Sequence, residues 1–108
     1  MTSIVRCLLA LMLAVFFNNN AVADDVKELY KTKCNACHGA DGRGDTAAGK
    51  KFSAHDFHSA DAQKLTDQEL MDRIKNGKNK MPAYKNKLTD EQIKDLVKYV
   101  RELGKSAK

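Results

Sequence analysis

The sequence Cys34-Asn35-Ala36-Cys37-His38 decides how this chain is organised. It has the pattern C-x-x-C-H, in which two thiols stand three residues apart and an imidazole directly follows the second. Residues three apart share one face of a helical turn, so both sulfurs can reach one edge of the same flat ligand. The adjacent imidazole can then reach the centre of that ligand. This pattern is the attachment sequence for a covalently bound haem, haem c, with its iron.

Three other uses of the pattern fit less well. A thiol–disulfide motif needs a strand followed by a helix, and this context is absent. A zinc site needs four ligands, but there is no second cysteine pair, and His55 and His58 are the only other imidazoles. A structural disulfide would close a small, strained loop. We therefore expect Cys34 and Cys37 to attach the haem.

The amino-terminal segment has the features of an export signal. Arg6 supplies a positive charge, and residues 7–17 (CLLALMLAVFF) form an apolar run that is short for a spanning helix. Ala21-Val22-Ala23 is an A-x-A cleavage pattern. We interpret residues 1–23 as a cleaved signal peptide and residues 24–108 as the exported domain, with the periplasm as its location. An uncleaved or lipid-linked anchor is the alternative.

Length, charge and composition limit the function further. The chain has 108 residues, enough for one domain, and a formal net charge of +5. No basic run or RNA-reading motif indicates nucleic-acid binding, but the excess allows docking on an acidic protein. Residues 24–108 contain only thirteen Leu, Val, Ile and Phe residues. A large apolar cofactor would complete so small a core, and we expect folding to depend on it.

The chain reads as all-α, with three main helices. The first is expected over about Asp25–Cys34, capped by Asp24 or Asp25. The second and third follow capping boxes that begin at Thr66 and Thr89 and should end at Gly77 and Gly104. Residues 45–62 indicate a loop with at most one helical turn, and Phe52 and Phe57 are expected to point inward.

The chain resembles the small bacterial class I cytochromes c over residues 24–108. The resemblance is carried by Leu29-Tyr30-x-x-x-Cys34-x-x-Cys37-His38-Gly39, Asn76-Gly77, Met81-Pro82-Ala83-Tyr84 and the capped last helix. It implies one covalent haem with His38 as the proximal and Met81 as the distal iron ligand. It also implies that the first and last helices cross at right angles, with Tyr30 against Leu96 and Tyr99.

The sequence departs from that family in two ways. Many relatives have a proline after the glycine loop, in the region that accepts a hydrogen bond from the proximal histidine. Pro82 is the only proline here, so a backbone carbonyl between Thr46 and Phe52 is expected to replace it. Many relatives also have a Trp near a haem propionate. This chain has no Trp, which leaves a Lys, Tyr84 or a His as candidate propionate partners.

The residues themselves also favour Met81 as the sixth ligand. Proline fixes its own φ and holds the preceding residue extended, so the backbone that presents the Met81 thioether has little freedom. Met71 lies on the apolar face of a predicted helix and is expected to pack in the core. His55 and His58 are predicted to be loop or surface residues.

The function that these features indicate is single-electron transfer between redox proteins, without enzymatic activity. We expect a soluble monomer without stable membrane insertion, whose donor and acceptor carry acidic docking surfaces. The expected basic face consists of Lys75, Lys78, Lys80, Lys85 and Lys87. Two alternatives remain open: a haem protein with an open distal site, acting as a gas sensor or weak peroxidase, and a dedicated cytochrome subunit of a larger enzyme.

Overall fold

The structure, a computed structural model, describes residues 20–106, with side chains from residue 25 onward. Residues 1–19, most of the predicted signal peptide, lie outside the described residues, so its cleavage remains a prediction. The helices in chain order are α2 (Asn20–Lys33), α3 (Asn35–His38), α4 (Ala47–Phe52), α5 (Ala60–Lys64), α6 (Asp67–Asn76) and α7 (Asp90–Lys105). Within the described part, the β structure is limited to one isolated bridge between Lys78 and Met81. The all-α prediction is confirmed.

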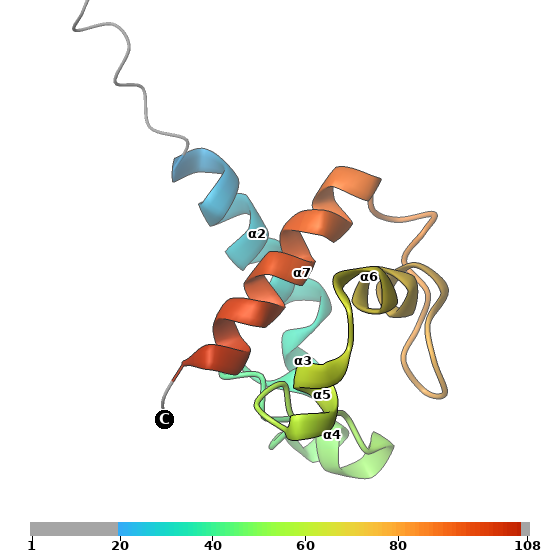
Figure 1. Cartoon of the computed structure of the whole chain (residues 1–108). Helices are drawn as coiled ribbons and strands as arrows, with labels where there is room; N and C mark the ends of the chain where they lie inside the picture. The colour runs from blue at the N-terminus through green and yellow to red at the C-terminus, as the bar shows by residue number, and fades with distance from the viewer. Residues whose placement is uncertain (1–19, 107–108) are drawn as a thin grey trace, which may run out of the picture.

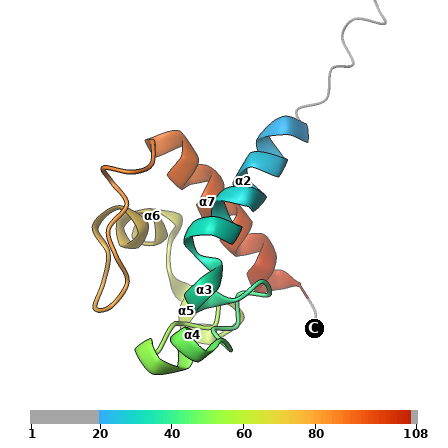
Figure 2. The same cartoon turned by 180° about the vertical axis from the view of Figure 1, so that it is seen from behind.

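Helices α2 and α7 cross each other, as both views of the fold show (Figures 1 and 2). At the contact the Tyr30 and Tyr99 rings meet edge to face, with their centroids 5.0 Å apart, a favoured arrangement for aromatic pairs. Leu96 and Ile93 of α7 are buried beside them. The pairing expected for Tyr30 is therefore confirmed. It holds α2, which leads into the C-x-x-C-H sequence, against α7.

The capping boxes are present at both predicted positions. The hydroxyls of Thr66 and Thr89 accept from the backbone N–H groups of Glu69 and Gln92, whose side chains accept in return from the Thr N–H groups. Each box satisfies two backbone donors that a helix start leaves unpaired. Gly77 ends α6 with a positive φ of 73°, as predicted. Helix α6 lies beside α7 (Figure 1).

Two predicted helix boundaries are wrong. Helix α2 begins at Asn20 and ends at Lys33, so Asp24 and Asp25 both lie inside the helix and neither is its N-cap. Helix α7 continues through Gly104 to Lys105. Gly104 is there for close packing, because a Cβ at this position would lie 2.7 Å from the Phe57 carbonyl oxygen.

Residues 45–62 contain more helix than the sequence predicted. Thr46 and Ser59 cap α4 and α5 with their hydroxyls, a common way to start a short helix. The inward prediction holds for Phe57, which packs against the core. It is wrong for Phe52, which is 42% exposed and lies under the Lys51 ammonium group at 5.4 Å.

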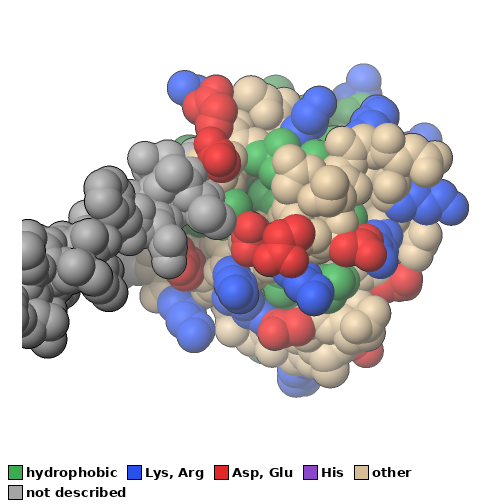
Figure 3. All heavy atoms as spheres, turned by 90° about the horizontal axis from the view of Figure 1, so that it is seen from above, with side chains coloured by type: hydrophobic (Ala, Val, Ile, Leu, Met, Phe, Trp, Pro, Cys, Tyr) green, Lys and Arg blue, Asp and Glu red, His purple; other side chains and the backbone are tan. Residues whose placement is uncertain are grey.

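The surface over the α2–α7 crossing carries charges of both signs. Figure 3 shows acidic and basic side chains interspersed on this face, with apolar groups between them. A shallow groove there is lined by Asp25, Glu28 and Asp95, among others. Among the described helices, each is too short or too polar to span a membrane.

Candidate functional site

The C-x-x-C-H residues form a separate helical turn at the end of α2. The backbone continues from α2 into α3 through hydrogen bonds from the Cys34 N–H to the Tyr30 carbonyl (2.8 Å) and from the His38 N–H to the Cys34 carbonyl (3.0 Å). The Tyr30 hydroxyl donates to the Gly39 carbonyl at 2.6 Å. Tyr30, which contacts Tyr99 of α7, thus also holds the end of the turn that presents the thiols and the imidazole.

Helix α4 supports this turn from below. The Thr46 hydroxyl lies 2.7 and 3.0 Å from the carbonyl oxygens of Ala36 and Cys37, which share its single hydrogen, so the end of α3 has a side-chain donor. Gly49 is buried here, and a Cβ would clash with the Cys37 and Gly44 carbonyl oxygens. A glycine is therefore required for α4 to approach the C-x-x-C-H turn.

Met81 lies on a tight turn after α6. Its N–H donates to the Lys78 carbonyl at 2.9 Å, and its carbonyl accepts from the Lys78 N–H at 3.2 Å. Asn79 within the turn has a φ of 54°, a left-handed conformation that Asn tolerates better than most residues. A Cβ on Gly77 would lie 2.5 Å from the Met81 carbonyl oxygen. These contacts leave the Met81 backbone little freedom.

The segment after Met81 is tied to two other elements. The Tyr84 N–H donates to the Ile74 carbonyl of α6 at 3.0 Å. The Tyr84 hydroxyl donates to the Lys33 carbonyl, at the end of α2, also at 3.0 Å. Tyr84 is buried, so the loop that bears Met81 is anchored directly to the helix that leads into Cys34.

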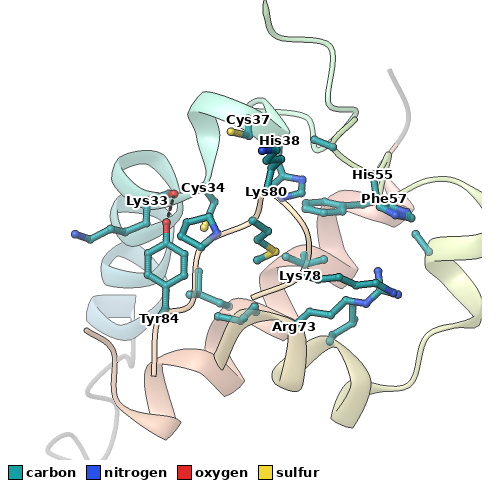
Figure 4. Close-up of a pocket in the computed structure, with 18 of the residues that line it drawn as sticks. Lys33, Cys34, Cys37, His38, His55, Phe57, Arg73, Lys78, Lys80 and Tyr84 are labelled. Atoms are coloured by element: carbon teal, nitrogen blue, oxygen red, sulfur yellow. Dashed lines mark hydrogen bonds between the residues drawn. The ribbon is translucent and has the colours of Figure 1, made fainter. Parts of the chain in front are cut away.

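The predicted site residues Cys34, Cys37, His38 and Met81 all line one pocket of about 250 Å³. Figure 4 shows Cys34, Cys37 and His38 together on one side of this pocket. The rest of its lining is largely apolar and includes Phe57, Leu65, Leu70, Ile74, Pro82, Leu96, Val97 and Val100. The structure therefore brings the four predicted residues together around an apolar space.

These residues suit a haem. Both thiols are free and half-buried, and burial, with Cys37 nearby, raises the pKa of Cys34 to about 11. Burial lowers the pKa of His38, an effect that the neighbouring His55 backbone offsets only in part. The imidazole is thus held neutral at pH 7, which is the form that binds a metal. Phe57 stacks on its ring at 4.8 Å between centroids and limits its orientation.

The expected hydrogen bond from His38 to a carbonyl between Thr46 and Phe52 is not formed. Among the described residues, the buried Nδ1 atom of His38 has no partner. Two carbonyls of this stretch accept from other donors, Thr46 from the Lys50 N–H and Gly49 from the Ala54 N–H.

The other candidate ligands lie in different surroundings. Met71 packs against the core and does not line the pocket. His58 bonds elsewhere: its Nδ1 lies 2.8 Å from an Asp56 carboxylate oxygen and its Nε2 lies 3.0 Å from the Ser106 carbonyl oxygen. His55 is an exposed residue at the pocket.

Sequence reasoning did not assign Arg73 or Lys33 to the site, and it predicted Phe57 to point inward without its contact to His38. Arg73 and Lys33 line the pocket, and Phe57 touches His38 itself. The helical spacing of Arg73 from Leu70 and Ile74 offered a signal, because residues three and four apart share a face. For Phe57 the sequence predicts the inward direction, but its contact with His38 depends on how the loop folds back.

Comparison with known proteins gives a consistent result. The family described as cytochrome c oxidase, cbb3-type, subunit III matches residues 21–100. Cytochrome c6 of Nostoc sp. (strain PCC 7120) is 33% identical over 96% of this chain and 91% of its own. Cytochrome c-553 of Helicobacter pylori is 41% identical over 78% of this chain and 83% of its own. A solved c-type cytochrome superposes with a TM-score of 0.68 and 37% identity, covering 73% of this chain and 96% of that structure.

The family match covers most of the chain, and the fold, the C-x-x-C-H turn and the apolar pocket agree with it. The chain therefore belongs to the small monohaem class I c-type cytochromes, which carry electrons on one covalently attached haem c.

Proposed function

We propose that this protein is a diffusible, exported electron carrier without enzymatic activity of its own. In this proposal Cys34 and Cys37 attach the haem, and His38 and Met81 are the two axial ligands of its iron. The observation that carries the proposal is that these four side chains line a single apolar pocket, with Met81 on a turn held by its own hydrogen bonds.

The residues of the pocket are suited to electron transfer in particular. A bound haem would supply a one-electron couple, and a thioether opposite an imidazole favours its reduced form. His38 and Met81 together would fill both axial positions, which leaves no open position for a substrate. The Tyr84 and Gly77 contacts described above hold the Met81 turn in place, so little rearrangement of the protein is needed when the charge changes.

Export and docking form the second part of the proposal. Cleavage after Ala23 would release residues 24–108 into the periplasm, as a monomer. Of the lysines predicted to form a basic face, Lys78, Lys80, Lys85 and Lys87 are exposed. Lys75 is half-buried and pairs with Asp90 at 3.0 Å. We propose that the four exposed lysines, the basic face from here on, dock acidic surfaces of a donor and an acceptor.

A dedicated cytochrome subunit is the second candidate function. It is favoured by the match to the oxidase family and by a relative named cbb3-type cytochrome c oxidase subunit CcoP in Azospirillum brasilense, 35% identical over 78% of this chain. The match covers only 29% of that longer protein. Size-exclusion chromatography of a native extract separates the two: a carrier elutes at its monomer size, and a subunit with its complex.

The proposed function is tested on the exported native protein. Its intact mass should equal residues 24–108 plus one haem, and its oxidised spectrum should show the weak long-wavelength band of methionine–iron ligation. A potentiometric titration should give one reversible one-electron couple. A protein without covalent haem would contradict the proposal. A haem protein that lacks the methionine band and binds carbon monoxide readily would instead be an open-site sensor or peroxidase.

A further inference from the structure

The charged lining of the pocket has a single sign. Four cations line the pocket, and within the described residues no Asp or Glu side chain joins them. The cations are Lys33, Arg73, Lys78 and Lys80. In a pocket that is otherwise largely apolar, such a set favours an anionic group on whatever fills it.

Arg73 is the cation that most needs a partner. The three lysines are exposed, whereas Arg73 is half-buried. The other arginines in the described residues each have a carboxylate nearby, with Arg43 3.7 Å from Asp41 and Arg101 3.0 Å from Asp67. Within that part of the chain the Arg73 guanidinium has no ion pair. A partly desolvated charge without a partner costs free energy, which an anion in the pocket would recover.

The position of Arg73 matches the covalent layout of haem. The two vinyl groups that react with cysteine lie on one edge of the porphyrin, and the two propionates lie on the opposite edge. Cys34 and Cys37 come from the α2–α3 junction, while Arg73 comes from α6. Figure 4 shows Arg73 and Lys78 on the side of the pocket away from Cys34 and Cys37. A haem attached at the cysteines therefore directs its carboxylates toward Arg73.

We propose that Arg73 forms an ion pair with a propionate of the bound haem and keeps that carboxylate ionised in both oxidation states. This assignment rests on the proposed haem pocket and extends it to the anionic edge of the cofactor. The guanidinium presents parallel N–H donors that match a carboxylate, which a lysine ammonium cannot do. This chain lacks the Trp that many relatives have near a propionate, and Arg73 serves as the propionate partner instead.

The ion pair has a consequence that can be measured. With Gln at position 73, the carboxylate remains in an apolar pocket without its cation, and desolvation favours its protonated form. Reduction then adds one electron to the iron and draws one proton from solvent onto the carboxylate. The reduction potential of Arg73→Gln should therefore depend on pH, with the equilibrium constant for reduction changing by up to tenfold per pH unit.

The experiment is a potentiometric titration of the holoprotein from pH 5 to 9 for wild type, Arg73→Gln and Arg73→Lys. The wild-type potential should be nearly flat. Arg73→Gln should have a lower potential at alkaline pH, where its carboxylate is ionised and unpaired, and should converge with wild type as the pH falls. Arg73→Lys keeps the charge and should remain close to wild type.

Controls separate this effect from other titrations and from charge alone. The other titratable groups that line the pocket are Tyr30, Tyr84, His38, His55 and the three lysines. The pH dependence should persist in a double variant with His55→Gln. Lys98→Gln, an equal charge loss at an exposed position on α7, should leave the potential unchanged.

Two outcomes would overturn the proposal. One is an Arg73→Gln potential that equals wild type at every pH. The other is a shift of the same size at every pH, which means a nearby charge and no contact with a titrating carboxylate. A wild-type protein without a covalent haem couple would instead overturn the proposed function itself, so the two failures are distinguishable.

Discussion

The Tyr84 hydroxyl donates a 3.0 Å hydrogen bond to the Lys33 carbonyl, across a separation of 51 residues. Lys33 is the last residue of α2 and directly precedes Cys34. Tyr84 lies three residues after Met81. This one contact therefore joins the helix that presents the thiols to the loop that presents the thioether.

Tyr84→Phe should weaken that connection without opening a cavity. The lost hydrogen bond leaves the Lys33 carbonyl without this partner, so we expect a loss of about 0.5–1.5 kcal/mol in the free energy of unfolding. The methionine–iron band should also disappear at a lower denaturant concentration than in wild type. Denaturant titrations followed at that band and by circular dichroism measure both effects. Tyr99→Phe is the matched control, because no hydrogen bond of its hydroxyl is found in the described residues, and an equal loss there would contradict the assignment.

Gly77→Ala should disturb the Met81 turn specifically. Gly77 has a φ of 73°, and an added Cβ would lie 2.5 Å from the Met81 carbonyl oxygen. With a ψ of 174° this conformation is essentially restricted to glycine, so the backbone strain alone costs roughly 1–3 kcal/mol, and the contact must be relieved by moving the turn. We expect reduced stability and a weakened methionine–iron band, measured by thermal unfolding and absorption. Asn79→Gly, in the same turn but already at a positive φ, should keep the band, and loss of the band in both variants would argue against a specific role of Gly77.

Local signals in the sequence predicted the helices better than the packing between them. The boxes at Thr66 and Thr89 can be read because capping is a contact over three residues. The hydroxyl caps of Thr46 and Ser59 are contacts of the same local kind, although the sequence prediction for residues 45–62 is a loop with at most one helical turn. The prediction of a helix end at Gly104 is wrong, because the role of this glycine depends on the Phe57 carbonyl, far away in the sequence.

In the candidate site, too, local sequence signals predict more than the packing between elements. Cys34, Cys37, His38 and Met81 belong to motifs that indicate their chemistry, so the sequence alone predicts them as site residues. Arg73 carries no motif, and its role depends on which face of α6 turns toward the pocket and on the absence of a carboxylate nearby. The spacing of Arg73 from Leu70 and Ile74 indicates that it shares their face of the helix, but its proposed partner can be inferred only when the elements around the pocket are placed.

Asp56 should contribute to stability in a pH-dependent way. Burial alone would raise the pKa of its carboxyl, but hydrogen bonds from the His58 backbone and ring, with the charges of His58 and Arg43, hold the pKa below its usual value. A group with a depressed pKa in the folded state stabilises above its unfolded pKa of about 3.9, and this stabilisation is lost as the pH falls through the folded value.

Asp56→Asn should therefore be less stable than wild type at pH 6–7, and the difference should shrink as the pH falls below about 4. Urea denaturation at a series of pH values measures the difference. Glu102→Gln, at an exposed position on α7, should differ little from wild type throughout. A stability difference for Asp56→Asn that stays constant down to acid pH would show that the carboxylate charge is not involved.

The basic face should govern reactions with charged partners. Lys78 and Lys80 lie within the turn that presents Met81, and both are exposed. The rate of oxidation by hexacyanoferrate, a small anion, should fall as salt is added, because the Debye length shortens to about 10 Å at 0.1 M. The rate with a cationic ruthenium hexaammine should rise. Replacing Lys78 and Lys80 by Gln should weaken the salt dependence of both rates more than replacing Lys94 and Lys98. Equal effects of the two pairs would mean that only the net charge of the protein matters.

Met81→Ala should change the chemistry of the site, and Met71→Ala should change only its stability. Met81 lines the pocket on a turn closed by two hydrogen bonds with Lys78, whereas Met71 packs in the core away from it. Removing the thioether should lower the reduction potential, abolish the methionine–iron band and let cyanide or carbon monoxide bind readily, because one axial position is then open. Met71→Ala should cost about 2–5 kcal/mol, or less in proportion to its partial exposure, with the spectrum unchanged. Potentiometry, absorption and ligand titration of both holoproteins give the comparison. If Met81→Ala kept the wild-type spectrum and potential, the sixth ligand would have to be another side chain, and His55, which borders the same pocket, would be the first to replace.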